Sequence, residues 1–417
     1  MKSNKEENIE TITKLNTFTP LLRLLHLSGL LPPLNIYRSS WKNFLYNIFS
    51  LLTFLSFIPL ILMQMTGFYI YRDNFTMITV IIFQLAAYFD GMVTMAYFLR
   101  HRKKLIKTFH LMETTFIPYM AKVGTPRIQE EILTKNKQFS KFITTVAIGA
   151  FLADMATWCV LPSVVRYSAY FRGEEELEEG KEHLEYFVLV MWLPKNATVF
   201  PRYQMLHTFQ FFSVWGVVAN YAAGKLIIVT LFYHLAAQFK ILASAIEEID
   251  TICANEISVS RDDQEKLNEV KQAIEGSLEN KTFCRDVNSF LTNILLFDLI
   301  IFQILMCLPP LQLIFGQNAS TFRFVSSIVD TGIWPLLICF WGEAVSQQSL
   351  AVQKAAYNCR WYDRSEKVKK LLLIVLMRTR EPVRMTAGKF YNLSLETFAD
   401  IENKVYAYFT LLKNMHG

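Results

Sequence analysis

Seven stretches of the chain have the length of a transmembrane helix, and six of them are nearly continuous hydrophobic runs. A helix of about 20 residues crosses the hydrocarbon core of a bilayer. The seventh stretch, 389–417, is long enough but carries several charges. The pattern therefore predicts an all-α membrane protein with seven transmembrane helices. The six apolar stretches lie at 43–66, 75–99, 142–165, 206–237, 290–314 and 321–345.

The polar segments between these stretches divide the chain into four regions. Residues 1–42 are polar and then mildly amphipathic, and we expect them to lie along the inner membrane surface. Residues 43–345 form the predicted six-helix bundle, in which the polar segment 238–288 has the pattern of two amphipathic helices. Residues 346–388 are basic, with an apolar run of seven residues that is too short to cross, and predict a cytosolic anchor helix. Residues 389–417 form the predicted seventh helix.

The distribution of basic residues predicts the orientation. With the N-terminus inside, the cytosolic segments hold 32 lysines and arginines and the outer loops hold six. This asymmetry follows the positive-inside rule, so we expect a cytosolic N-terminus and an extracellular C-terminus. G-protein-coupled receptors have the opposite orientation and are excluded. Glycosylation sequons at Asn74, Asn196 and Asn318 fall one in each predicted outer loop, but those at Asn280 and Asn392 fall inside, so their support is weak.

Composition narrows the class of protein. With 52% hydrophobic residues the chain is too apolar for a soluble domain, and a net charge of +6 is too small to indicate nucleic-acid binding. None of the six cysteines lies in a predicted outer loop, so no disulfide framework is expected. The sequence shows no metal-ligand spacing, no catalytic triad pattern and no glycine-rich phosphate loop. We therefore expect no metal, no cofactor and no enzymatic activity.

The seventh stretch has an unusual polar face. Helical spacing places Asp400, Lys404, Tyr408, Leu411 and Met415 near one side. A charge at mid-bilayer costs ~2.5–3.5 kcal/mol on insertion scales, so this side should face protein or water rather than lipid. Charges followed by apolar residues are typical of a water-filled path with an apolar constriction. In the alternative, which stays open, the helix lies in the protein interior and the charges four residues apart form an ion pair.

Several motifs near the C-terminus resemble those of insect odorant receptors. The chain has Ala-Gly-Lys-Phe at 387–390, Ser-Leu-Glu-Thr-Phe at 394–398 and Tyr-Ala-Tyr-Phe-Thr-Leu-Leu at 406–412. Phe-Trp-Gly-Glu at 340–343 resembles the family's Gly-Glu at the inner end of the sixth span. The chain differs from the family in the charges of Asp400, Glu402 and Lys404.

The resemblance implies an odorant-gated, non-selective cation channel in the plasma membrane of sensory neurons. In such channels four subunits surround one pore, and an odorant-binding subunit assembles with a co-receptor subunit as a heterotetramer within membrane lipid. The seventh helices line the pore, the cytosolic helices anchor the subunits, and the ligand pocket lies in the outer half of the bundle. By this resemblance the gate is Leu411. Its neighbours on the outer turn are Thr410, Asn414 and Met415, and Asp400 and Lys404 lie further along the pore helix.

A volatile hydrophobic ligand requires an apolar, aromatic pocket, because burial of its surface supplies nearly all the binding free energy. Single aromatic residues at helical spacing are more often packing residues, so the candidates are a stronger prediction as a group than one by one. The candidates in the outer half are Phe83, Tyr88, Met155, Trp158, Phe212, Trp215, Thr331 and Trp334.

Five charged residues lie within the apolar stretches, namely Asp90, Asp154, Lys225, Asp298 and Asp330. Unpaired charges are costly there, so we expect structural pairing or hydration inside the bundle, with a role in gating as the alternative. Such acids also occur in solute transporters, which are built from internal repeats and broken helices, and neither is evident here. The related gustatory receptors remain a second alternative, although their seventh-helix motif is shorter.

Overall fold

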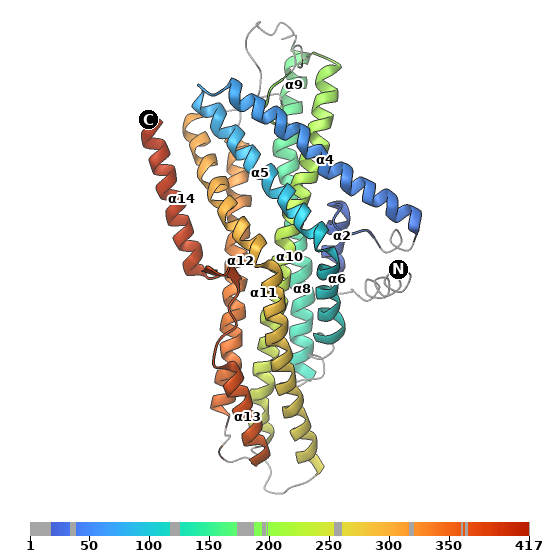
Figure 1. Cartoon of the computed structure of the whole chain (residues 1–417), viewed down its shortest axis with the longest axis vertical. Coiled ribbons are helices and arrows are strands. Elements are labelled where there is room, and N and C mark those ends of the chain that lie inside the picture. The colour runs from blue at the N-terminus through green and yellow to red at the C-terminus, as the bar shows by residue number, and fades with distance from the viewer. Residues whose placement is uncertain are drawn as a thin grey trace.

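The protein is a bundle of long helices that run along one axis, as a computed structural model shows (Figure 1). The structure describes residues 18–33, 39–116, 126–172, 187–193, 197, 199–253, 261–316, 321–359, 362 and 366–416. The N-terminal half contains α2 (Thr19–Leu27), α4 (Ser40–Ile70), α5 (Phe75–Arg100), α6 (Arg102–Leu111), the π-helical turn η1 (Met112–Phe116), α8 (Pro126–Met155), a second π-helical turn η2 (Ala156–Val160) and α9 (Leu161–Phe171). The C-terminal half contains α10 (Arg202–Cys253), α11 (Arg261–Phe315), α12 (Thr321–Asn358), α13 (Glu366–Thr379), strands β1 (Thr386–Ala387) and β2 (Tyr391–Asn392), and α14 (Leu395–His416).

Six of the described helical segments are long and apolar enough to cross a membrane, and they contain the six stretches predicted from hydropathy. The seventh helix, α14, has 22 residues. At 1.5 Å per residue it is about 33 Å long, sufficient to cross the hydrocarbon core. The prediction of an all-α membrane protein is confirmed, apart from the two-residue strands β1 and β2.

Helix α10 forms the centre of the bundle. In its most apolar stretch of 18 residues 89% of the residues are buried, against 22% in α4 and 22% in Thr134–Ser168, which includes most of α8. It packs against α12, α11, α5, α8 and α4. A helix that is apolar on all sides is stable only when it is surrounded by protein or lipid, and here other helices supply most of that surrounding. Residues on several sides of α10 can therefore face a buried site.

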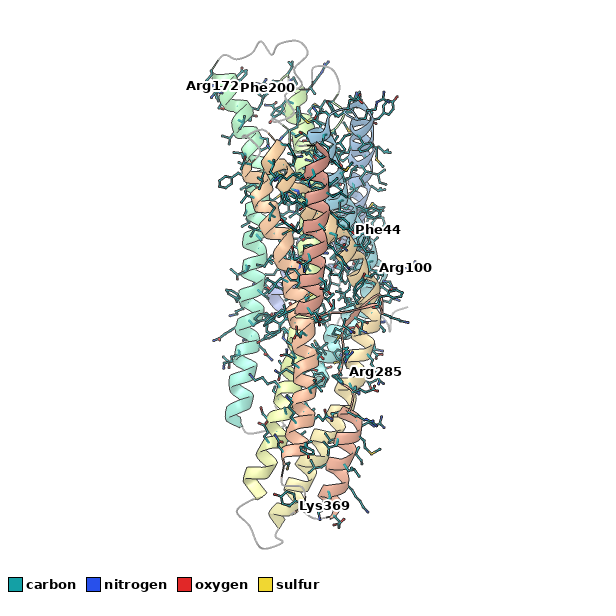
Figure 2. The ribbon with its side chains drawn as sticks, turned by 90° about the vertical axis from the view of Figure 1, so that its left-hand side faces the viewer. Phe44, Arg100, Arg172, Phe200, Arg285 and Lys369 are labelled. Atoms are coloured by element: carbon teal, nitrogen blue, oxygen red, sulfur yellow. The ribbon has the colours of Figure 1, made fainter. Side chains whose placement is uncertain are left out.

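The molecule is elongated, and its two ends differ. Arg172 and Phe200 lie at one end, Lys369 lies at the other, and Arg100, where α5 ends, lies between them (Figure 2). The C-terminus lies toward the end that contains α9, and α13 lies at the opposite end (Figure 1). The long helices α10, α11 and α12 therefore continue well past the level at which α5 ends.

Two predicted region boundaries fall elsewhere in the structure. Residue 345 lies inside α12, which continues without interruption to Asn358, so the anchor region begins as an extension of the sixth span. The separate helix of that region is α13. The seventh helix begins at Leu395 rather than at residue 389. Gly388 and Lys389 both have positive φ, a conformation that an α-helix does not contain. They form the tight turn between β1 and β2.

The N-terminal segment is more buried than its amphipathic pattern predicted. Phe18, Leu21 and Leu25 are each 0% exposed, and α2 packs against α10 and α8. Asn220 of α10 donates a hydrogen bond to the Ser28 carbonyl at 3.0 Å, just after α2 ends. Residues 18–33 are therefore packed against α8 and α10 of the bundle, whereas the amphipathic pattern predicted a segment along the inner membrane surface.

Candidate functional site

A cavity of about 100 Å³ lies within the bundle, among α5, α8 with η2, α10, α11, α12 and the segment 187–193. Most of its wall is hydrocarbon. It is lined by Phe83, Gln84, Ala87, Tyr88, Asp154, Trp158, Val188, Leu189, Val214, Val217, Val218, Tyr221, Leu305, Ser327, Asp330 and Thr331.

An aromatic cluster forms one wall of the cavity. The rings of Phe83 and Trp158 are stacked, with centroids 6.0 Å apart, and Phe324 meets both edge-on. The indole N–H of Trp158 donates to Ser327 Oγ at 3.3 Å. Trp158 lies in the π-helical turn η2, a local widening that often marks functional sites in helices. The turn and the hydrogen bond hold the indole in place at the cavity wall.

Gln84 ties the segment 187–193 to α5 as part of the cavity wall. Its Oε1 accepts from the Val190 N–H at 2.9 Å and from Gln64 Nε2 at 3.2 Å. Its Nε2 donates to the Val188 carbonyl at 3.3 Å. Gln210 of α10 adds a further bond, in which its Oε1 accepts from the Val188 N–H at 3.1 Å. Buried backbone groups need such partners, so these amides let a non-helical segment enter the bundle.

A charged cluster lies directly beside this cavity. Lys225 Nζ lies 2.7 Å from Asp298 Oδ1 and 3.3 Å from Asp90 Oδ2, and the three side chains are at most 8% exposed. The cluster lines a smaller cavity of about 20 Å³, and Tyr221, Leu305 and Thr331 line both cavities. The predicted pairing of intramembrane charges is confirmed for these three residues. Each of these charges is tolerated in the low-dielectric interior only because its counter-ion is buried beside it.

Helix α14 lies at the edge of the bundle and exposes one face (Figure 1). Ile401 and Val405 turn toward the bundle and are 2% and 6% exposed. On the other side Leu411 is 59% and Met415 is 68% exposed. Asp400, Lys404 and Asn414 are also exposed, and Thr410 is half-buried. The face predicted from helical spacing is therefore uncovered in a single chain.

The charges on α14 do not pair with each other. Lys404 Nζ lies 5.8 Å from the centre of the Tyr391 ring, and within the described residues no ion pair joins Lys404 to Asp400. The alternative of an interior helix stabilised by this pair therefore does not hold.

The start of α14 is fixed to α12. Glu343 Oε2 accepts a hydrogen bond from the Leu395 N–H at 2.8 Å, and Ser394 Oγ accepts one from the Thr397 N–H at 3.1 Å. Both contacts satisfy N–H groups that a helix leaves without partners in its first turn. A Cβ at Gly342 would lie 2.7 Å from the Leu393 Cβ, so only glycine allows this close approach.

The comparisons with known proteins can be set against this geometry. A family model described as "7tm Odorant receptor" matches residues 82–406. The chain belongs to the odorant receptor family. The family consists of receptors rather than enzymes, and among the described residues no group of three or more histidine, cysteine or acidic side chains is placed to hold a metal ion.

Individual relatives of this odorant receptor are distant. It is 25% identical to Odorant receptor 13a of Drosophila melanogaster over 274 residues, which are 62% of this chain and 63% of that protein. It is 36% identical over 97 residues to the odorant receptor coreceptor of Ooceraea biroi, covering 23% of this chain and 20% of that one. The structure of olfactory receptor OR5 from Machilis hrabei in complex with eugenol matches with a TM-score of 0.78 at 13% identity, covering 98% of this chain and 100% of that one.

Four of the eight predicted ligand residues of this odorant receptor come together at the cavity: Phe83, Tyr88, Trp158 and Thr331. Trp334 lines the smaller cavity instead and donates from Nε1 to Asp330 Oδ1 at 3.2 Å.

The other three predicted ligand residues lie elsewhere. Met155 is buried outside the cavity lining, and Trp215 packs edge-on against Phe151 with centroids 4.7 Å apart. Phe212 is 65% exposed on the outside of α10, because it lies on a different side of that helix from the cavity residues.

Several lining residues were not predicted. Val214, Val218 and Tyr221 follow an i, i+4, i+7 stripe on α10, a pattern that could have identified them. Val188 and Leu189 belong to a segment without regular periodicity, so no helical pattern pointed to them. Asp154 and Asp330 were predicted to be structural charges rather than cavity residues.

Of the three predicted glycosylation positions, Asn74 is the one that the structure describes. It is exposed, and its Oδ1 caps α5 by accepting from the Met77 N–H at 3.2 Å. Asn196 and Asn318 lie outside the described residues.

Proposed function

We propose that this chain is the odorant-binding subunit of a ligand-gated, non-selective cation channel. A small volatile, hydrophobic ligand binds in the cavity in the outer half of the bundle, and the pore lies along α14 with its gate at Leu411. The observation that carries the proposal is the position of Leu305, which lines the cavity and belongs to the apolar cluster on which α14 rests.

Two contacts support coupling between the cavity and α14. Leu305 is part of a buried cluster of α5, α11 and α12 residues against which Phe409 and Leu412 of α14 pack. Leu412 directly follows the proposed gate residue. Phe302, which lines the smaller cavity, is stacked with Phe398 of α14, with centroids 6.3 Å apart. A ligand that fits the cavity better when these contacts rearrange would shift the closed–open equilibrium by its difference in affinity for the two states.

The exposed face of α14 supports a pore shared between subunits. Asp400 and Lys404 would be costly against lipid, so water or neighbouring subunits should surround them. Four chains around one axis would place this face on a hydrated path and Leu411 at an apolar constriction. The anchor region, with exposed Leu373 and Met377 on α13, would hold the subunits together at the cytosolic end.

The partner is proposed to be a co-receptor subunit in a heterotetramer at the plasma membrane of sensory neurons. The similarity to a coreceptor covers 97 residues. The N-terminus would be cytosolic and the C-terminus extracellular, as the positive-inside rule favours. Asn74 would then be available for glycosylation on the outer side.

The test is to co-express the chain with a co-receptor and record currents under a panel of volatiles. We expect cation current for some of them, and no evoked current from a complex present at the cell surface would contradict the proposal. Leu305→Ala should lower the maximal current or raise the EC50 by about tenfold, because removing a buried leucine loosens both the cavity wall and the cluster under α14. Leu313→Ala is the matched control, because Leu313 lies on the same helix and is 39% exposed.

A further inference from the structure

Asp154 is a buried acid in the cavity wall without a partner. Its residue is 9% exposed and it lines the cavity. Among the described residues no hydrogen bond or ion pair reaches its carboxyl group. It lies in the last turn of α8, one residue before Met155 and the π-helical turn η2. Burying a polar group without a partner is costly, so a carboxyl group in a cavity wall is a ready acceptor for a polar ligand.

Several of the other polar side chains that line the cavity are already engaged. The exception is the Tyr88 hydroxyl, which is buried and has no hydrogen-bond partner among the described residues. The amide of Gln84 is used by Gln64, Val188 and Val190. The Ser327 hydroxyl donates to the Arg323 carbonyl and accepts from the Trp158 indole.

Two further hydrogen bonds complete this pattern. The Thr331 hydroxyl donates to the Ser327 carbonyl, and Asp330 Oδ1 accepts from Trp334. These groups hold the wall together, whereas the Asp154 carboxyl group remains open toward the cavity.

The nearby cations are also committed elsewhere. Lys225 pairs with Asp298 and Asp90. Arg323 donates to the Phe187 carbonyl and lies over the Trp158 ring at 5.8 Å. Asp330 is close enough to interact electrostatically with Asp154, and it adds a second carboxyl group to the same cavity. The cavity therefore offers its occupant the carboxyl groups of Asp154 and Asp330 and the hydroxyl of Tyr88, and no free cation among the described residues.

We infer that the cavity selects small apolar ligands that carry a hydrogen-bond-donating head, a hydroxyl or a protonated amine, which binds to the carboxyl group of Asp154. The aromatic wall of Phe83 and Trp158 takes the hydrocarbon part of the ligand. The inference rests on the proposed function, because it names the class of ligand for the same cavity.

The first experiment uses the unaltered chain, co-expressed with a co-receptor, and probes that differ only in their heads. Benzyl alcohol and benzylamine donate hydrogen bonds, benzaldehyde only accepts them, and toluene does neither. 1-Octanol, octylamine and octanal form a second series for a longer ligand. A hydrogen bond that satisfies an otherwise unpartnered buried group predicts an EC50 about tenfold lower for the donor-headed probe in one of the series. Equal potency of aldehyde and donor in both series would overturn the inference.

The second experiment changes the acid itself. In Asp154→Leu the advantage of the alcohol and the amine over the aldehyde should fall below about threefold. Asp154→Asn keeps an acceptor oxygen, so it should spare the alcohol and weaken the amine. Asp73→Asn is the control, because it removes a carboxylate from an exposed turn, where the side chain is 95% exposed. Surface labelling of each variant separates altered recognition from failed folding.

The outcomes also separate this inference from the proposed function. Two outcomes would overturn the inference alone. In the first, volatiles evoke currents that do not depend on the head group. In the second, Asp154→Leu reaches the cell surface and its responses to alcohol and amine are unchanged. Silence of the unaltered complex at the cell surface toward the whole panel would overturn both. Responses that prefer donors and lose that preference in Asp154→Leu would support both.

Discussion

Lys225 joins three helices through its ion pairs with Asp90 of α5 and Asp298 of α11. Lys225→Met would leave two buried carboxyl groups without their counter-ion, which typically costs about 3–5 kcal/mol. We expect a markedly lower thermal unfolding temperature of the detergent-solubilised complex, measured by size-exclusion chromatography after heating. Lys240→Met, at an exposed position on the same helix, should have little effect.

Neutralising the acids as well should reverse much of this loss. The combined variant Lys225→Met, Asp90→Asn, Asp298→Asn removes the buried charges together and should unfold at a higher temperature than Lys225→Met alone. If Lys225→Met is as stable as the unaltered protein, the ion pairs are not the source of stability that their burial indicates.

Gln84 holds a non-helical part of the cavity wall through Val188 and Val190. Gln84→Leu has a similar volume but leaves the Val190 N–H and the Val188 carbonyl without these partners, at about 1–3 kcal/mol for each buried group. We expect the EC50 of any agonist to rise about tenfold or more, measured from dose–response currents. Gln303→Leu on α11 is the control, since among the described residues Gln303 bonds within its own helix, to the Leu299 carbonyl. An unchanged EC50 for Gln84→Leu would show that this segment does not shape the cavity.

At the scale of single residues, sequence reasoning succeeded where aromatic chemistry was the guide. Phe83 and Tyr88 both line the cavity, although they lie five positions apart on α5 and so do not share one helical face. Phe212 does not line the cavity as predicted. Helix α10 is apolar on all sides, so its sequence does not distinguish the lipid-facing side from the buried side. The sequence indicated that an unpaired charge at Asp154 would be energetically costly. Only the three-dimensional structure shows that Lys225 pairs with two other acids instead.

The connection between α12 and α14 depends on Glu343, which binds the first turn of the proposed pore helix. Glu343→Ala removes the acceptor for the Leu395 N–H, a loss comparable to that of a helix cap, about 0.5–2 kcal/mol. We expect a lower maximal ligand-evoked current at unchanged surface level, because α14 would follow movements of α12 less faithfully.

Glu343→Gln is the matched variant, since it keeps an acceptor oxygen at the same position and should retain most of the current. Glu366→Ala, on the exposed first turn of α13, serves as a second control. Normal current in Glu343→Ala would show that this contact plays no part in gating.

At the scale of elements, hydropathy identified the six apolar helices, because about 20 apolar residues leave few alternatives to a transmembrane helix. The local turn at Gly388 and Lys389 was not predicted, although the positive φ of Gly388 explains why glycine stands at that position of the motif. The burial of α2 was also missed. Its groove is built by α8 and α10, and no pattern within residues 1–42 describes that groove.

The assembled molecule should place one face of α14 in water. All five cysteines whose side chains the structure describes are buried and free, so we expect them to react little with a thiol reagent. We expect Leu411→Cys and Met415→Cys to react with a charged methanethiosulfonate reagent and to lose current, because both positions are exposed. Val405→Cys, at a position 6% exposed toward the bundle, should remain insensitive. The reverse pattern would place the conduction path elsewhere.

At the scale of the whole molecule, the seven-helix architecture followed from length and hydropathy, and the orientation remains a prediction from charge. The motifs at 387–390 and 406–412 indicated the family, which the match to residues 82–406 shows. The cavity could not be located in this way, since its walls come from α5, α8, α10, α11, α12 and a segment between α9 and α10.

Helices α10 and α11 have 52 and 55 residues, about 80 Å each at 1.5 Å per residue, against a hydrocarbon thickness of about 30 Å. More than half of each rod therefore extends beyond the hydrocarbon core, away from the aromatic wall of the cavity. Single substitutions at one end of such rods can therefore change the wall of the cavity without altering the residues at the other end.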